Sequence, residues 1–185
     1  MTIQMRRRLL YIPVFHIDTN LINARQKLPS VNQLEKWFED EVILINISDT
    51  AYNEAKAGGS IQRTRKANHQ IYTKTLSAGT DDPLYREIEE ILFPGGTRND
   101  NQRNDVKIVC DAAKYAAILV TGDGGSKSQP GGIIGNRDKL RAIVKILSLK
   151  EAVIFIREKI QERDEFNKRV SKEIGGQLPA WTDLD

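Results

Sequence analysis

The chain has 185 residues, of which 39% are hydrophobic and 29% are charged, and this balance excludes an intrinsically disordered protein. No run approaches the roughly 18 apolar residues of a membrane span, and a single cysteine, Cys110, excludes an internal disulfide. The net charge of +3 permits a polyanionic partner without requiring one. We therefore expect one soluble domain over residues 1–185, located in the cytoplasm, with no membrane partner.

Short apolar runs alternate along the chain with longer segments of helical periodicity. Strands are predicted at 11–17, 42–47, 118–121 and 143–149. Helices are predicted from residue 18 and over 31–41, 49–57, 60–76, 83–93, 105–117 and 136–142. Polar or glycine-rich loops are expected at 77–82, 94–105 and 122–132. A long charged helix is predicted from about Glu151 to Ile174.

Strands that are separated by helices imply right-handed crossovers and a parallel sheet covered on both faces. We therefore predict an α/β protein, a three-layer α/β/α fold with a central parallel sheet. Its core would span about 12–149, and the C-terminal helix about 150–175. Ligands of such sheets bind beyond the carboxyl ends of the strands, so the polar residues at those ends are the candidate functional residues.

Four acidic residues are predicted to meet at this edge of the sheet. Asp18 closes the first strand, and Glu54 lies about one and a half turns into the helix after the second. Asp105 begins the helix that leads into the third strand, and Asp123 follows that strand. Each acid alone has an ordinary explanation as a cap, a surface group or a turn residue. Their joint pattern indicates a catalytic site.

Four carboxylates in one place repel one another, and a bound cation relieves that repulsion. Mg²⁺ or Mn²⁺ prefers oxygen ligands, and can activate a water molecule beside a phosphate. Asp18, Asp105 and Asp123 are therefore the predicted metal ligands. Zinc is not expected, because His16 and His69 are the only histidines.

Asp111 lies on the same predicted helix as Asp105 but is left out of this site. Its position is rotated by about 120° around the helix axis. Lys107 and Lys114 flank it at the spacing of an exposed, salt-bridged stripe. We therefore expect Asp111 to face solvent.

Basic residues offer weaker candidates for contacts with phosphate. Arg63, Arg65 and Lys66 lie in the acid-free segment 60–76, and Lys127 lies in the loop after Asp123. Taken alone, these charges are better explained by a solvated helix face and a surface loop. Beside an acidic nuclease site, they become candidates for nucleic-acid binding.

Three segments, VFHIDTNLI, SDTAYNEAKAG and NDVKIVCDAAKYAAILVTGDGG, resemble in order and spacing the motifs of the PIN-domain (PilT N-terminus) ribonuclease-like family. The resemblance covers roughly residues 12–149. It assigns the family's acidic positions to Asp18, Glu54, Asp105 and Asp123, with Asn20 and Thr121 as supporting groups.

The resemblance implies a three-layer fold and an endoribonuclease that depends on Mg²⁺ or Mn²⁺. Many members are VapC-like toxins of toxin–antitoxin pairs, so it also implies an antitoxin partner and a homodimer. This chain departs from the compact toxins through its 77–104 region, its C-terminal helix and the glycine-rich loop after Asp123.

The sequence also allows functions other than cleavage of RNA. Single-stranded DNA is an alternative substrate, and a catalytically inactive RNA-binding or scaffold protein would keep the same fold. A haloacid dehalogenase-like phosphatase needs a second Asp two residues after the first, where this chain has Asn20. The loop GDGGSKSQPGG suggests nucleotide binding, but it lacks the G-x-x-x-x-G-K-[ST] spacing.

Overall fold

A five-stranded parallel sheet forms the centre of the protein. The computed structural model describes residues 8–22, 28–57, 61, 65, 73–77, 79–126 and 129–185. The strands are β1 (Phe15–Ile17), β2 (Ile45–Ser48), β3 (Thr73–Thr75), β4 (Ile118–Thr121) and β7 (Lys145–Ser148). They are ordered β3-β2-β1-β4-β7, and every neighbouring pair is parallel. All the carboxyl ends therefore lie along one edge.

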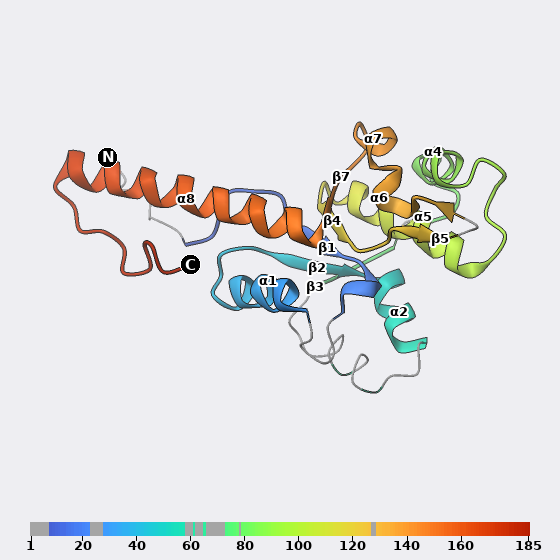
Figure 1. The fold of residues 1–185 in the computed structure, drawn as a ribbon, viewed down its shortest axis with the longest axis horizontal. Coiled ribbons are helices and arrows are strands. Elements are labelled where there is room, and N and C mark those ends of the chain that lie inside the picture. The colour runs from blue at the N-terminus through green and yellow to red at the C-terminus, as the bar shows by residue number, and fades with distance from the viewer. Residues whose placement is uncertain are drawn as a thin grey trace.

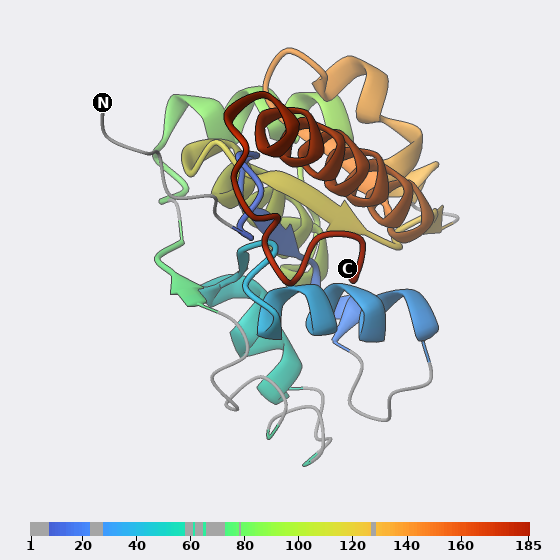
Figure 2. The same ribbon diagram turned by 90° about the vertical axis from the view of Figure 1, so that its left-hand side faces the viewer.

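Helices cover both faces of the sheet. On one face lie α1 (Pro29–Glu39) and α8 (Leu149–Ile174), and the rings of Phe15 and Phe155 meet edge to face with centroids 6.5 Å apart. On the other lies α5 (Asp100–Lys114), where His16 contacts Tyr115 with ring centroids 5.7 Å apart. The helices α2 (Asp49–Ala57) and α4 (Pro83–Leu92) pack against α5 (Figures 1 and 2). The predicted three-layer α/β/α fold is confirmed.

Two segments depart from the predicted elements before the third predicted strand. Residues 73–75 were expected in a helix over 60–76 but form β3, a short edge strand of three polar residues without apolar alternation, of which only Thr75 is buried. Of 60–72, the structure describes only residues 61 and 65, both helical. Residues 100–104 were expected in a loop but begin α5, since the side chain of Asn99 caps this helix by accepting a hydrogen bond from Gln102 N at 3.0 Å.

Two further segments are less regular or more structured than predicted. The helix expected from residue 18 is a single 3₁₀ turn, η1 (Thr19–Leu21). The loop at 122–132 contains a short antiparallel pair, β5 (Gly125–Ser126) and β6 (Gln129–Pro130). Two short helices follow, α6 (Gly132–Gly135) and α7 (Arg137–Leu140).

The C-terminal helix α8 is confirmed and begins with a capping box formed by Ser148 and Glu151. Its first half is buried against the sheet through Val153, Ile156 and Ile160, and its second half extends beyond the sheet (Figure 1). No helix in the described part of the chain combines the length and apolar character needed to cross a membrane.

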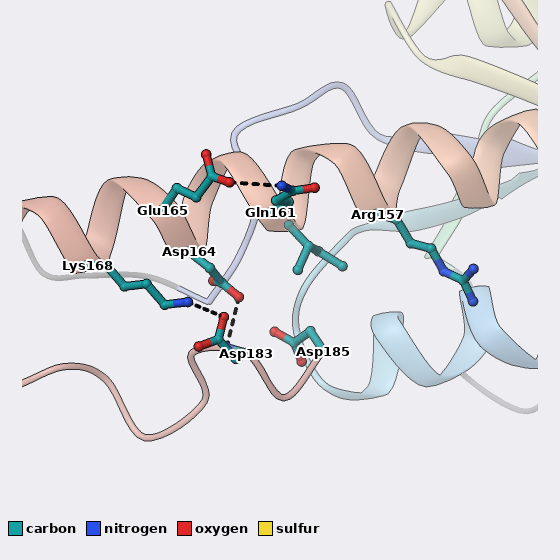
Figure 3. Close-up of a pocket in the computed structure, with 8 residues that line it drawn as sticks. Arg157, Gln161, Asp164, Glu165, Lys168, Asp183 and Asp185 are labelled. Atoms are coloured by element: carbon teal, nitrogen blue, oxygen red, sulfur yellow. Dashed lines mark hydrogen bonds and ion pairs between the residues drawn. The ribbon is translucent and has the colours of Figure 1, made fainter.

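The segment after α8 turns back along that helix and is held by charged groups. The Arg163 guanidinium donates to the Asp185 carboxylate at 2.8 Å and lies 4.5 Å from the Trp181 ring centroid. Asp183 is bonded twice: its backbone N donates to Asp164 at 2.9 Å, and its carboxylate accepts from Lys168 at 2.7 Å (Figure 3). Ion pairs and one ring contact thus hold this segment on the outer half of α8.

The two halves of α8 should contribute unequally to stability. Ile156 is fully buried, whereas Phe166 is 55% exposed. We expect Ile156→Ala to lower the free energy of unfolding by about 2–5 kcal/mol, because it leaves a cavity against the sheet. Phe166→Ala should change it by less than about 0.5 kcal/mol. Urea unfolding measures both, and equal losses would contradict this division.

Candidate acidic site

Asp18 follows β1 directly and is buried, with 5% of its surface exposed. Its backbone N donates to Val120 O at 3.0 Å, which keeps the chain beside β4 after β1 ends. Its carboxylate Oδ2 accepts hydrogen bonds from Thr121 Oγ1 and, at 2.7 Å, from Asn20 Nδ2. Burial raises the pKa of Asp18 to about 6, although the Thr121 hydrogen bond opposes this shift.

The two predicted supporting residues lie against Asp18. Asn20 Nδ2 is also 3.4 Å from Thr121 Oγ1, and Asn20 Oδ1 accepts from Gly122 N at 3.1 Å. The end of β1 and the end of β4 are thereby tied together through side chains. The Asp18 carboxylate is oriented by donors from both strand ends.

Glu54 lies on α2 and is held at both carboxylate oxygens. Thr19 Oγ1 donates to Oε2 at 2.7 Å, and Asn104 Nδ2 donates to Oε1 at 2.8 Å. Thr19 comes from η1 and Asn104 from α5, so three elements fix the position of Glu54. Asn104 and Thr19 are not among the residues predicted from the sequence. Their position next to Asp105 and Asp18 was the only available signal.

Asp105 does not begin its helix as predicted but lies more than one turn inside α5. Within the part of the chain that the structure describes, no hydrogen-bond donor contacts its carboxylate. Burial, and then the negative charges of Asp123, Asp18 and Glu54, raise the pKa of Asp105 to about 7. All three other acids therefore act electrostatically on this one carboxylate.

Asp123 follows β4 and is bonded to its own loop. Its Oδ1 accepts from Gly125 N at 3.1 Å, and its Oδ2 accepts from Ile133 N at 2.8 Å. Its backbone N donates to Thr121 Oγ1 at 2.9 Å. Gly132 allows this arrangement, because a Cβ there would lie 2.4 Å from Asp123 Oδ2 and its φ is +55°. Asp123 thus joins the site to the segment 125–133.

The four acids have the charge and the donor atoms that suit a hard divalent cation. Across the described residues, no lysine or arginine forms an ion pair with any of them. Nor do the described residues include three His, Cys, Asp or Glu side chains grouped closely enough to hold a metal ion. Mg²⁺ usually binds through one or two carboxylates, several waters and a substrate phosphate, so a pair of these acids fits it.

Asp111 is not on an exposed stripe, and the prediction that it faces solvent is wrong. Its surface is fully buried, and its Oδ2 accepts from Ser77 Oγ at 3.0 Å. The segment after β3 covers this side of α5, which periodicity within one helix does not reveal.

The basic residues predicted to contact nucleic acid are only partly described. Arg63, Lys66 and Lys127 lie outside the described residues, whereas Arg65 is described and exposed.

Comparisons with known proteins show similarity at the level of fold only. No family model and no curated protein matches the chain. The structure of VapBC2 from Rickettsia felis bound to a DNA fragment from their promoter is 20% identical, with a TM-score of 0.48, and covers 73% of this chain and 98% of that chain. FitAB bound to an IR36 DNA fragment is 15% identical with a TM-score of 0.48, covering 74% and 95%. FitAcB from Neisseria gonorrhoeae is 16% identical with a TM-score of 0.46, covering 74% and 98%. Similarity at this level assigns neither a family nor an activity.

The raised pKa values of Asp18 and Asp105 predict a characteristic pH dependence of stability. An acid with a raised pKa in the folded state ionises more easily when the chain unfolds, so ionisation favours unfolding. Without divalent cations, the free energy of unfolding should fall as the pH rises from the ordinary 3.8 through about 6 and about 7. Asp105→Asn should flatten this fall, as urea unfolding at several pH values would show.

Glu151 provides a control, because its pKa is shifted in the opposite direction from that of Asp105. The pKa of Glu151 is lowered to about 2, chiefly by hydrogen bonds from Ser148, so its contribution is lost only below its ordinary value of 4.5. Glu151→Gln should leave the slope above about pH 5 unchanged. Equal slopes in wild type and Asp105→Asn would show that Asp105 ionises normally.

The contact between Gly132 and Asp123 should be sensitive to a single methyl group. Gly132→Ala places Cβ against Asp123 Oδ2 and the backbone of Gly125, at a positive φ. We expect a loss of about 1–3 kcal/mol in the free energy of unfolding. Gly124→Ala is the matched control, because nothing lies within 4 Å of a Cβ at Gly124. Thermal unfolding of both variants tests this, and equal melting temperatures would count against it.

Proposed function

We propose that this protein is a nuclease of the PIN type that depends on Mg²⁺ or Mn²⁺, and that it cleaves RNA internally. One observation carries the proposal. Burial and then the charges of Asp18, Glu54 and Asp123 raise the pKa of Asp105, and among the described residues none of these four acids forms an ion pair with a lysine or arginine. A site that accumulates uncompensated negative charge is suited to a cation and, through it, to a phosphate.

The hydrogen bonds of each acid indicate the role it would have in the site. Asp18 and Asp105 would hold the cation, because Asp18 is fixed by Thr121 and Asn20 while Asp105 has no donor among the described residues. Asp123 would join them when its bonds to Gly125 N and Ile133 N open. A bound Mg²⁺ or Mn²⁺ supplies an activated water and stabilises charge on the phosphate.

Glu54 would orient the attacking water. Thr19 and Asn104 hold its two oxygens in place, so the carboxylate needs no rearrangement before it accepts a hydrogen bond from water. Attack on phosphorus breaks its bond to the 3′ oxygen, which takes up a proton. The products are a 3′-hydroxyl and a 5′-phosphate.

A second candidate is an RNA-binding or scaffold protein with the same fold and no catalysis. It is favoured by one observation, that both oxygens of Glu54 and both oxygens of Asp123 already accept hydrogen bonds within the protein. The two candidates differ in whether RNA is cut after it binds.

An antitoxin and a second copy of the chain are proposed as partners on the resemblance alone. Size measurements on the purified protein, and on the protein produced with the product of a neighbouring gene, address these two proposals separately from catalysis.

Purified protein should cleave a mixed-sequence RNA with Mn²⁺ or Mg²⁺ and stop when EDTA is added. Asp18→Asn and Asp105→Asn should each lower the rate by about 100-fold or more, because several kcal/mol of transition-state stabilisation depends on the cation. End-labelled RNA resolved on a gel gives both the rate and the chemistry of the ends.

The matched control is Asp100→Asn, which changes an exposed acid on the same helix as Asp105. It should retain the wild-type rate. Metal-dependent cleavage that is unaltered in both Asp18→Asn and Asp105→Asn would rule out these roles, and RNA binding without cleavage in either metal would favour the scaffold.

A further inference from the structure

A polar hollow lies between α2 and α5, next to the acidic site. It encloses about 340 Å³, and its hydrogen-bonding lining includes Thr50, Asn53, Glu54, Ser77, Asn104 and Lys107. We refer to it as the α2–α5 groove. Its volume is at the lower end of the range of roughly 300–1,000 Å³ for small-ligand sites, which suits one nucleotide.

The groove shares a wall with the acidic site. Glu54 belongs to both, and the hydrogen bond from Asn104 Nδ2 to Glu54 Oε1 spans the boundary at 2.8 Å. Asn104 also precedes Asp105 in the same helix. A nucleic-acid strand with a phosphate at Asp105 would therefore place an adjoining nucleotide at or near this groove.

One side of the groove is fixed by a network of hydroxyl groups. Ser77 Oγ accepts from Thr50 N at 3.0 Å, lies 2.7 Å from Thr50 Oγ1 and donates to the buried Asp111 at 3.0 Å. These bonds join α2, the segment after β3 and α5. Asp111 has no role in the proposed catalysis. Its buried carboxylate instead helps to hold Ser77 in the wall of the groove.

The other groups offer a cation and an amide to a ligand. Lys107 is partly exposed and forms no ion pair with any described residue, and Asn53 is exposed. Asp49, also in the lining, is paired with Lys74 at 2.6 Å, and Lys74 lies 4.7 Å from the Tyr52 ring centroid. The acid at this end is therefore neutralised, while the charge of Lys107 is available.

We propose that the α2–α5 groove binds one nucleotide of a single-stranded nucleic acid, beside the phosphodiester that is cleaved. Lys107 contacts a phosphate, and Asn53 hydrogen-bonds the base edge or the sugar. Phosphate contacts by lysine position a chain, and single strands expose the base edges and sugar hydroxyls that amides bind. Cleavage beside the groove rests on the proposed function, whereas binding in the groove does not.

Binding is measured in the cleavage-deficient Asp18→Asn background, with Mg²⁺ and a fluorescein-labelled RNA of about ten nucleotides. Adding Lys107→Ala should weaken binding about 3- to 10-fold and lower the salt dependence by about 0.7, the value for one phosphate contact on a single strand. Adding Asn53→Ala should weaken it about 2- to 10-fold, the range for one lost hydrogen bond. A DNA of the same sequence forms the second arm.

Lys172→Ala is the charge-matched control, because Lys172 is exposed near the distant end of α8. It should change affinity by less than twofold. Weakening by both groove variants with RNA, with DNA or with both supports the groove and identifies the sugar it accepts. Unchanged affinity in both variants, for both nucleic acids, would overturn it.

The wild-type cleavage assay separates this inference from the proposed function. If the wild type cleaves RNA and the groove variants bind with unchanged affinity, the proposed nuclease activity stands and the proposed groove binding fails. If the groove variants weaken binding but the wild type cleaves nothing in any divalent metal, the proposed nuclease activity fails and the proposed binding site stands. Circular dichroism of each variant confirms that the fold is retained before affinities are compared.

Discussion

Negative charges that gather at the end of a buried strand repel one another, and the edge of this sheet is organised around that repulsion. Parallel strands place all their carboxyl ends together, so Asp18, Glu54, Asp105 and Asp123 act on the same region although they are scattered along the chain. Burial of Asp18 increases the cost, because a charge away from water is poorly solvated. Burial, as the larger cause, and then repulsion from the neighbouring acids raise the pKa values of Asp18 and Asp105.

Among the described residues, neutral hydrogen-bond donors rather than cations orient Asp18 and Glu54. Thr121 and Asn20 hold Asp18, and Thr19 and Asn104 hold Glu54. Hydroxyl and amide groups fix the direction of a carboxylate and leave its charge in place, whereas a lysine or arginine would cancel it. This choice of partners keeps the edge of the sheet attractive to a cation and, beyond the cation, to phosphate.

Asp105 and Asp123 differ in how their carboxylates are hydrogen-bonded. The Asp105 carboxylate accepts no hydrogen bond from the described residues, whereas Asp123 is committed to the backbone of 125–133. Because the contact at Gly132 leaves no room for a side chain, the position of this segment and the direction of Asp123 depend on each other. A ligand that drew Asp123 away from Gly125 N and Ile133 N would also loosen the backbone at those two residues.

Local sequence determined the class of fold and the chain positions of the acids. Three apolar residues followed by Thr121 predicted β4 with its observed bounds, and acids placed just after β1 and β4 lie at the carboxyl edge. Tertiary structure decided the rest. It formed strand β3, buried Asp111 and placed Asp123 in a hydrogen bond with Ile133 N. It also joined Asn104 to Glu54 by a hydrogen bond, although they are 50 residues apart. Periodicity reports only which face of an element is apolar. The partner of a polar group depends on which other element packs beside it, and that is settled by burial across the whole domain.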